Sequence, residues 1–329
     1  MNGQTAMVAN EGVLSAVGNT PLVELKRFIA GARFRLYAKL EGLNPGGSMK
    51  DRPAMRMIEQ GLRSGFINSG AVIIESSSGN MGIGLAQVCS YYGLQFICVV
   101  DPKTTQQNIR LLQVYGAEID LIAEPDPETG EFLKARIDRV KSLLESIKNS
   151  FWPNQYANEN NSDAHHQTMD EIVSAMGRKV DYLFCTVSTC GTLRGCSEYV
   201  RKHKLNTKVI AVDAKGSVIF NSEKTKRLIP GHGAAVRPQL FRDDIASECI
   251  YVTDLDSVIG CRRLVRREAI LAGGSSGAAL MGVHHYQDRI QSGSNCAVIL
   301  PDRGERYLDT IYSDLWVKEN FGDISHFWQ

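Results

Sequence analysis

The chain has 329 residues, of which 43% are hydrophobic and 22% are charged, and its formal net charge is +1. This composition is ordinary for a globular protein that is long enough to form two lobes. The near-zero net charge excludes a strongly basic surface for nucleic acid or an anionic membrane. No apolar run is long enough to span a bilayer.

The first residues and the cysteines both indicate a cytoplasmic protein. MNGQTAMVANEG, residues 1–12, lacks the basic and apolar regions of a secretion signal. None of the eight cysteines forms a CxxC pair, and several lie in apolar runs such as FICVV, which favours a reduced compartment over a disulfide framework. The histidine pairs 165–166 and 284–285 lack a zinc-type ligand set, so we predict no metal site.

Strand-like runs alternate with helical patterns along the chain. We expect a polar stretch, NQYANENNSDAHHQ at 154–167, to connect two lobes. The strand-like runs are apolar at successive positions, which indicates that both faces of each strand are covered and that the fold is α/β with parallel sheets. The predicted strands are residues 71–76, 94–100, 118–123, 182–188, 208–214, 248–254 and 295–301.

A lysine stands at the expected start of a helix in NPGGSMKDRPA, residues 44–54. Ser48 and Asp51 have the spacing of a capping box, and Pro53 suits a first helical turn. Lys50 would then lie near the positive end of the helix dipole, which disfavours a cation. One interpretation is a solvated lysine. The other is an amine nucleophile that must spend time uncharged.

Three loops that follow predicted strands are rich in glycine and hydroxyl groups. They are ESSSGNMG (75–82), VSTCGTLRG (187–195) and AGGSSGAA (272–279). Such loops bind anions at helix N-termini, although each alone could be a helix cap or a close-packed turn. None matches a dinucleotide or P-loop fingerprint. A phosphate site without a nucleotide, together with a lysine amine, indicates pyridoxal 5′-phosphate.

The ordered set GNTPLV, NPGGSMKDR, SSGN, NQYAN, STCGT, GGSSG and PDRGERY covers nearly the whole chain. It resembles the fold-type II pyridoxal-phosphate enzymes of the cysteine synthase and cystathionine β-synthase family. The resemblance implies two open, twisted, parallel-type sheets flanked by helices, with the cofactor in the cleft between two lobes. It also implies a small mobile domain at 51–155 and a large domain formed by 1–50 and 156–329.

The resemblance assigns roles to individual positions. Lys50 would form the Schiff base with the cofactor and then remove the Cα proton of the substrate. Asn80 would lie beside the ring hydroxyl, and Ser275 would face the ring nitrogen. The remaining predicted cofactor ligands form a phosphate cup, namely Ser188, Thr189, Cys190, Gly191 and Thr192. The predicted ligands of the substrate carboxylate are Ser77, Ser78, Gly79 and Gln155.

A serine at the ring nitrogen also indicates which reaction is favoured. A carboxylate there would keep the nitrogen protonated and make the ring a deep electron sink. A hydroxyl does so much less, and this favours prompt expulsion of the β-substituent over transamination. The implied reaction is β-replacement through an aminoacrylate.

Departures from the cysteine synthase pattern are informative. Those enzymes show TSGNT and GTGGT where this chain has SSGNM and STCGT, so Met81, Ser188 and Cys190 are unusual. We interpret Cys190 as a tolerated small residue rather than a redox group. Several blocks, including AVDAKGSVIF and PDRGERYLDTIYSDLW, resemble the branch of N-(2-amino-2-carboxyethyl)-L-glutamate synthases, which act in 2,3-diaminopropionate formation for staphyloferrin B-type siderophores.

That branch implies O-phospho-L-serine as donor and the amine of L-glutamate as nucleophile, with phosphate released. It also implies a homodimer and a downstream NAD-dependent oxidase-type partner enzyme. Such anionic substrates need cationic or multi-donor partners. The candidates are Arg136 in FLKARIDRVKSLL, Tyr156, Ser188 and, more weakly, Arg237. For Arg136 the competing interpretation is an exposed arginine on an amphipathic helix.

Two rival functions remain open from the sequence. The first is a cysteine synthase that uses sulfide with O-acetylserine or O-phosphoserine. The second is a catalytically silent member of the family that acts as a scaffold.

Overall fold

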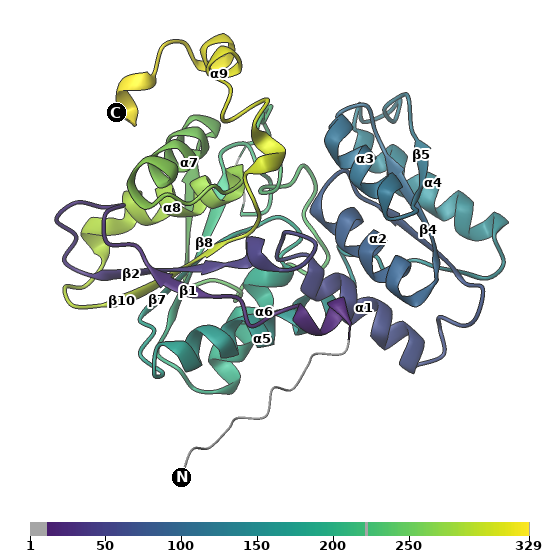
Figure 1. The fold of residues 1–329 in the computed structure, drawn as a ribbon, viewed down its shortest axis with the longest axis horizontal. Coiled ribbons are helices and arrows are strands. Elements are labelled where there is room, and N and C mark those ends of the chain that lie inside the picture. The colour runs from purple at the N-terminus through teal and green to yellow at the C-terminus, as the bar shows by residue number, and fades with distance from the viewer. Residues whose placement is uncertain (1–11, 221–222, 329) are drawn as a thin grey trace.

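The computed structural model describes residues 12–220 and 223–328, which form two lobes that are each built on one sheet (Figure 1). The larger sheet has the strand order β1-β2-β10-β7-β8-β9, and the smaller sheet has the order β5-β4-β3-β6. Strand β1 is antiparallel to β2, and the other described strand pairs are parallel. The predicted α/β fold with two parallel-type sheets is confirmed.

The predicted strands are all present, and three others, β1, β2 and β6, were missed. The strands are β1 (Leu22–Glu24), β2 (Arg35–Leu40), β3 (Val72–Ser76), β4 (Gln95–Val100), β5 (Glu118–Leu121), β6 (Ser150–Phe151), β7 (Tyr182–Thr186), β8 (Lys208–Ala214), β9 (Glu248–Val252) and β10 (Asn295–Leu300). Strands β1 and β6 are too short to show a pattern. In β2, RLYAKL, charged residues interrupt the apolar run.

Nine α-helices flank the sheets in the described part of the chain. They are α1 (Asp51–Arg63), α2 (Asn80–Tyr92), α3 (Gln106–Val114), α4 (Phe132–Ser146), α5 (Glu159–Ala175), α6 (Gly191–Lys202), α7 (Asp254–Glu268), α8 (Gly274–Tyr286) and α9 (Asp314–Phe321). Among these helices, none has the length and apolar character that crossing a membrane requires.

Alternate residues of the central strands pack into different helical layers. In β7, Tyr182 and Phe184 belong to the core shared with α7 and α8, whereas Leu183 and Cys185 belong to the core shared with α5 and α6. The smaller sheet is likewise packed on both faces, against α1 and α2 on one side and α4 on the other. This double coverage explains the unbroken apolar runs in the sequence.

The polar stretch 154–167 connects the two sheets as predicted, since it leads from β6 of the smaller sheet to α5 beside the larger one. The polar composition of this stretch hides a helix, because α5 begins within it at Glu159. The side chain of Asn158 accepts the N–H of Asn160 and caps that helix. Helix α1 packs against both α2 and α5. The domain boundaries 51–155 and 1–50 with 156–329 stay a prediction.

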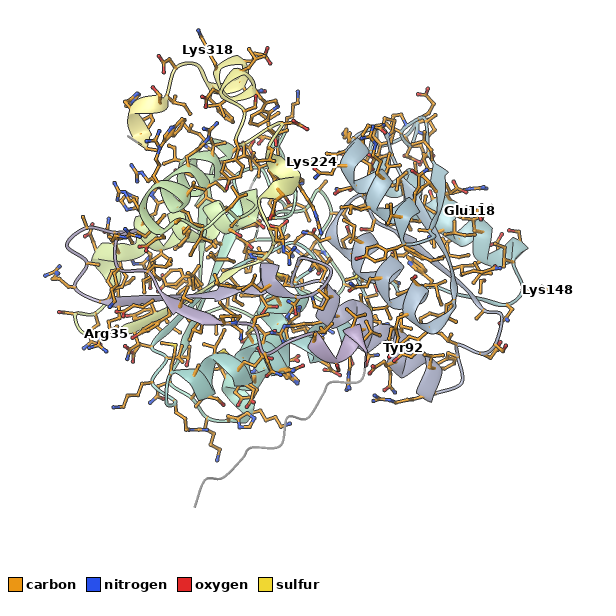
Figure 2. All side chains as sticks on the ribbon, in the orientation of Figure 1. Arg35, Tyr92, Glu118, Lys148, Lys224 and Lys318 are labelled. Carbon is orange, nitrogen blue, oxygen red and sulfur yellow. The ribbon has the colours of Figure 1, made fainter. Side chains whose placement is uncertain are left out.

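Side chains also join the lobes across their facing edges. Lys224, on the large lobe where it faces the small lobe (Figure 2), pairs with Glu131, which precedes α4. Asn80 of α2 contacts Asp302 and Arg306, which follow β10. The two lobes are therefore tied by polar contacts at two separate places.

Candidate active site

A pocket at the carboxyl ends of the parallel strands collects all eight predicted cofactor ligands. It encloses about 400 Å³ when its open mouth is counted. Its lining comprises Met49, Lys50, Asn80, residues 186–193, Gly231, Ser275 and Pro301. This edge is where α/β folds generally bind ligands, because the loops after successive strands meet there.

Lys50 immediately precedes α1, as its position in the sequence indicated, but the predicted capping box is wrong. The hydroxyl of Ser48 accepts the N–H of Lys50 at 3.1 Å, whereas the Asp51 carboxylate accepts the N–H of Gly46 at 2.5 Å. The turn through Gly47, with a φ of 87°, brings that N–H group onto Asp51. Helix α1 therefore begins at Asp51, with Pro53 inside its first turn.

The electrostatics of Lys50 favour the nucleophile over the solvated lysine. Its half-buried side chain lines the pocket, and desolvation lowers its pKa to about 8, with a smaller opposing effect of Cys190. At neutral pH the uncharged fraction of the amine is then on the order of 100-fold larger than for an ordinary lysine. An uncharged amine can attack an aldehyde or accept a proton.

The predicted phosphate cup is a tight turn between β7 and α6. Cys190 occupies the left-handed region with φ 67°, and α6 begins at Gly191. The first N–H groups of a helix have no acceptor within it, and the dipole makes this end positive. A Cβ at Gly191 would lie 2.3 Å from Oδ1 of Asn161, so the turn lies close against α5. These features suit a phosphate monoester.

The hydroxyls of two threonines of the cup form polar contacts with side chains of α5. Oγ1 of Thr189 accepts Nδ2 of Asn161 at 3.2 Å, and Oγ1 of Thr192 lies 3.2 Å from Nε2 of His165. Nδ1 of His165 lies 3.1 Å from Oγ1 of Thr168. Burial, followed by the charges of Lys50 and Arg52, lowers the pKa of His165 well below its ordinary value. A neutral imidazole can accept from one threonine and donate to the other.

Asn80 and Ser275 lie at the first turns of α2 and α8, and both line the pocket. The Asn80 amide donates from Nδ2 to Oδ2 of Asp302 at 2.8 Å, and its Oδ1 accepts from Nη1 of Arg306. Ser275 is buried, and a Cβ at Gly231 would lie 3.6 Å from its Oγ. PDRGERY is one of the family motifs in the sequence, but no signal there assigned Asp302 and Arg306 to the site.

The predicted carboxylate loop is partly engaged in local structure. Oγ of Ser77 accepts the N–H of Gly82 in the first turn of α2 at 2.9 Å, although the N-cap residue of this helix is Gly79. The Ser78 carbonyl accepts Nδ2 of Asn108 at 3.0 Å. Nε2 of Gln155 donates to the Ser76 carbonyl at 3.2 Å, which brings Gln155 to the loop. Ser77, Ser78, Gly79 and Gln155 do not line the described pocket around Lys50, and their binding of substrate stays a prediction.

Arg136 is not the exposed surface arginine of the competing interpretation. It is 9% exposed, and its Nε lies 3.3 Å from Oδ2 of Asp101. In the described chain neither Nε nor Nη1 has a hydrogen-bond partner. Burial raises the pKa of Tyr156, and the charges of Arg136, Glu75 and Arg227 also act on it, so these groups share one region. The guanidinium of Arg237 instead lies 4.8 Å over the ring of Phe241.

One group of potential metal ligands occurs in the described residues, away from this pocket. Ligand atoms of Asp163, His166 and Glu198 lie within 4.8 Å of one another. Glu198 also accepts Nε of Arg194 at 2.7 Å, and a guanidinium beside one of three ligands opposes a second cation. The absence of a metal site therefore stays a prediction.

Comparisons with known proteins show the family to which the chain belongs. The family described as "Pyridoxal-phosphate dependent enzyme" matches residues 13–302. A hydrogen sulfide-producing enzyme from Fusobacterium nucleatum is 33% identical with a TM-score of 0.85, covering 92% of this chain and 100% of that one. An O-acetylserine dependent cystathionine β-synthase from Helicobacter pylori is 30% identical with a TM-score of 0.87, covering 93% and 100%. An O-ureido-L-serine synthase is 27% identical with a TM-score of 0.87, covering 94% and 96%.

The residues present fit the cofactor that this family uses. The pocket combines a lysine amine of lowered pKa with a helix N-terminus whose small residues leave room for a phosphate. A buried serine hydroxyl at the start of α8 lines the same pocket. The enzyme assignment replaces the alternative of a catalytically silent scaffold. The chain belongs to the pyridoxal-phosphate dependent enzymes, and it is a β-substituting enzyme of the cysteine synthase type.

Proposed function

We propose that this enzyme joins O-phospho-L-serine to L-glutamate. The bond between Cβ and the phosphate oxygen breaks, and a bond forms between Cβ and the glutamate nitrogen. The products are N-(2-amino-2-carboxyethyl)-L-glutamate and phosphate. When bound, pyridoxal phosphate supplies an electron-withdrawing ring that stabilises negative charge on the substrate Cα.

Lys50 performs the proton transfer in this proposal. Its lowered pKa leaves a useful fraction of neutral amine at physiological pH, and a neutral amine can accept the Cα proton. The first turn of α6 and the hydroxyls of Thr189 and Thr192 hold the phosphate of the cofactor. Ser275 places a neutral hydroxyl at the ring nitrogen, which favours loss of the β-substituent.

The single observation that carries the choice of substrate is the buried, incompletely paired guanidinium of Arg136. Its contact with Asp101 leaves both Nε and Nη1 without a hydrogen bond. Buried donors without partners cost free energy, whereas an anion with several oxygens would satisfy them. Both substrates carry an anionic group that O-acetylserine and sulfide lack, namely the phosphoryl group of the donor and the side-chain carboxylate of the acceptor.

The surroundings of Arg136 support a role for this cation near the predicted substrate loop. Arg136 projects from α4, which packs on β3 and β4. Asp101 directly follows β4, and residues 77–79 directly follow β3. Burial raises the pKa of Tyr156, and the charge of Arg136 opposes this shift. Tyr156 directly follows Gln155, whose side-chain amide donates to the Ser76 carbonyl. Ser188 adds a further hydroxyl to the pocket on the side of β7.

A sulfide-using cysteine synthase is the second candidate. It is supported by the similarity to the hydrogen sulfide-producing enzyme and to the O-acetylserine dependent cystathionine β-synthase. That function would give no ligand to Nε and Nη1 of Arg136, which have no hydrogen bond.

Product analysis separates the two candidates. The enzyme loaded with pyridoxal phosphate is incubated with O-phospho-L-serine or O-acetyl-L-serine, and each donor is paired with glutamate or with sulfide. We expect phosphate release that depends on glutamate, and a new species with the mass of the glutamate adduct. Cysteine formed from sulfide, with no adduct in either glutamate reaction, would contradict the proposal.

The cysteine usage predicts a cytoplasmic location. The family resemblance adds two further predictions, namely a homodimer and an NAD-dependent oxidase-type enzyme that acts on the product. The last follows the chemistry of the adduct: NAD would oxidise its secondary amine to an imine at the glutamate Cα, and water would then cleave the original Cα–N bond of glutamate, which leaves the new Cβ–N bond in 2,3-diaminopropionate.

A further inference from the structure

The side-chain amide of Asn80 is held at both of its polar atoms by one short segment, residues 301–307. Oδ2 of Asp302 accepts from Nδ2 at 2.8 Å, and Nη1 of Arg306 donates to Oδ1. An amide can rotate by half a turn and exchange its oxygen and nitrogen with little change in shape. Here an acceptor faces the nitrogen and a donor faces the oxygen, so only one of the two orientations satisfies both partners.

Asp302 has little freedom to move away from Asn80. It is 2% exposed, and Oδ2 also accepts the hydroxyl of Tyr307 at 2.6 Å. A Cβ at Gly273 would lie 2.1 Å from Oδ1, so this glycine is packed directly against the carboxylate. Burial raises the pKa of Asp302. Both hydrogen bonds go to Oδ2, and Oδ1 has no described partner, so Oδ2 accepts in either protonation state.

Arg306 is anchored to the loop that carries Lys50. Its Nη2 donates to the Gly46 carbonyl at 2.6 Å, while Nη1 reaches Asn80. The backbone of the segment pairs with the same loop, since the N–H of Met49 donates to the Pro301 carbonyl at 2.8 Å. One segment therefore fixes the distance between the start of α1 and the start of α2.

We propose that Asp302 and Arg306 are positioning residues that set the orientation of the Asn80 amide for the cofactor. One Nδ2 hydrogen is used by Asp302, and the other is left for the pocket that Asn80 lines. This inference rests on the predicted role of Asn80 as the partner of the cofactor ring hydroxyl. It is independent of which donor and acceptor the enzyme uses.

A double-mutant cycle on cofactor affinity tests the inference. Apoenzyme of wild type, Asn80→Ala, Arg306→Met and the double variant is titrated with pyridoxal phosphate and followed by tryptophan fluorescence. One lost hydrogen bond predicts about a tenfold weaker affinity for each single variant. If Arg306 acts through Asn80, the double variant is no weaker than Asn80→Ala. If the fold-losses of cofactor affinity in the two single variants multiply in the double variant, the two residues act independently and the positioning role is refuted.

Arg303 provides the matched control. It lies in the same segment and donates from Nε to the Gly42 carbonyl at 2.7 Å, and its described contacts do not include Asn80. We expect Arg303→Met to bind the cofactor within twofold of wild type. A loss equal to that of Arg306→Met would show a general disturbance of the segment and would overturn the inference.

A second variant keeps the test decisive if Arg306→Met does not fold. Asp302→Asn keeps the size of the side chain, and its amide can present donors to Nδ2 of Asn80 in place of an acceptor. The same cycle is then run with Asp302→Asn in place of Arg306→Met. The double variant is again expected to bind the cofactor no more weakly than Asn80→Ala. Wild-type affinity in Asn80→Ala would instead refute the role of Asn80 itself. The product analysis above tests the proposed reaction separately.

Discussion

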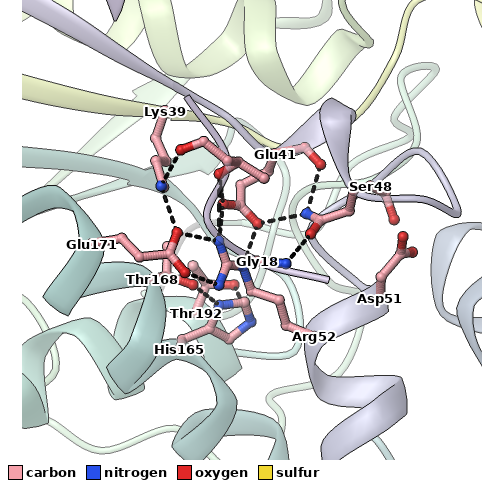
Figure 3. Close-up of polar contacts among 12 residues, drawn as sticks. Gly18, Lys39, Glu41, Ser48, Asp51, Arg52, His165, Thr168, Glu171 and Thr192 are labelled. Carbon is pink, nitrogen blue, oxygen red and sulfur yellow. Dashed lines mark hydrogen bonds and ion pairs between the residues drawn. The ribbon is translucent and has the colours of Figure 1, made fainter. Parts of the chain in front are cut away.

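Arg52 and Glu41 form a buried pair with two parallel hydrogen bonds. Nε of Arg52 lies 2.7 Å from Oε2 of Glu41, and Nη2 lies 2.7 Å from Oε1. Arg52 also binds Glu171 at 2.7 and 2.8 Å, and Lys39 binds Glu171 at 2.6 Å (Figure 3). The cations of Lys39 and Arg52 and the carboxylates of Glu41 and Glu171 thus neutralise one another. Arg52, at the centre of this network, is the second residue of α1. This network fixes the helix start behind Lys50.

Replacing Arg52 by Met should strongly destabilise the fold. The change leaves the carboxylate of Glu41 buried without its main partner, and breaking a buried pair in this way costs about 3–5 kcal/mol. The free energy of unfolding from denaturant titration measures the effect. Arg63→Met is the control, because Arg63 pairs with Glu59 four residues earlier on the surface of the same helix and should change stability by less than about 0.5 kcal/mol. Equal effects of the two variants would refute the role of the network.

The rate at which apoenzyme captures pyridoxal phosphate should rise with pH and level off above the pKa of Lys50, near 8. The reason is that only the neutral amine attacks the aldehyde. Stopped-flow absorbance between pH 6.5 and 10 gives the profile. A rate that continues to rise through pH 10 would indicate an ordinary lysine.

The same lowered pKa has a consequence for stability. The unfolded chain, with its pKa near 10.5, binds more protons than the folded chain between about pH 8 and pH 10.5. Stability should therefore rise with pH in this range relative to Lys50→Met, which lacks the titrating amine. A difference between the two proteins that does not change with pH would contradict the lowered pKa.

Cys190 should tolerate glycine but not valine. Its φ of 67° lies in the left-handed region, where a side chain costs about 1–2 kcal/mol and a β-branched one is least tolerated. We expect Cys190→Gly to retain cofactor binding, whereas Cys190→Val should lose stability and bind pyridoxal phosphate less tightly. Thermal unfolding and cofactor titration check both variants. Wild-type behaviour of Cys190→Val would show that the turn does not require this conformation.

Replacing Arg136 by Met should raise the KM for a substrate by about 10- to 100-fold, since a hydrogen bond to a charged group contributes about 1.5–3 kcal/mol. The affinity for pyridoxal phosphate should not change. Arg139→Met is the control on the same helix, because Arg139 pairs with Asp120 at 2.8 Å near the surface. Steady-state kinetics with each substrate varied in turn measures the effect. An unchanged KM in Arg136→Met would remove this residue from the site.

Much of the architecture could be predicted because apolar strands covered on both faces leave a local signal. Strand β2 was not predicted, because Lys39 interrupts its apolar pattern. This lysine can be buried in the fold because the carboxylate of Glu171 on α5 neutralises its charge. The glycine- and hydroxyl-rich loops around Lys50, Asn80, Ser188 and Ser275 could also be found, because anion sites at helix N-termini use characteristic residues.

Contacts set by the tertiary structure could not be predicted in the same way. Asp51 bonds to Gly46 rather than forming a capping box, because the turn through Gly47 places that N–H group nearby. The burial of Arg136 depends on how α4 packs, which its amphipathic pattern does not specify. The contacts of Asp302 and Arg306 with Asn80 join positions more than 220 residues apart.

The role of Lys50 is tested most directly by locating the cofactor on the chain. The holoenzyme is reduced with borohydride, which fixes pyridoxal phosphate to the amine that holds it, and the digested protein is analysed by mass spectrometry. We expect the modification on the peptide that contains Lys50, and its loss in Lys50→Ala. Modification of another lysine in the wild-type enzyme, with Lys50 unmodified, would contradict it.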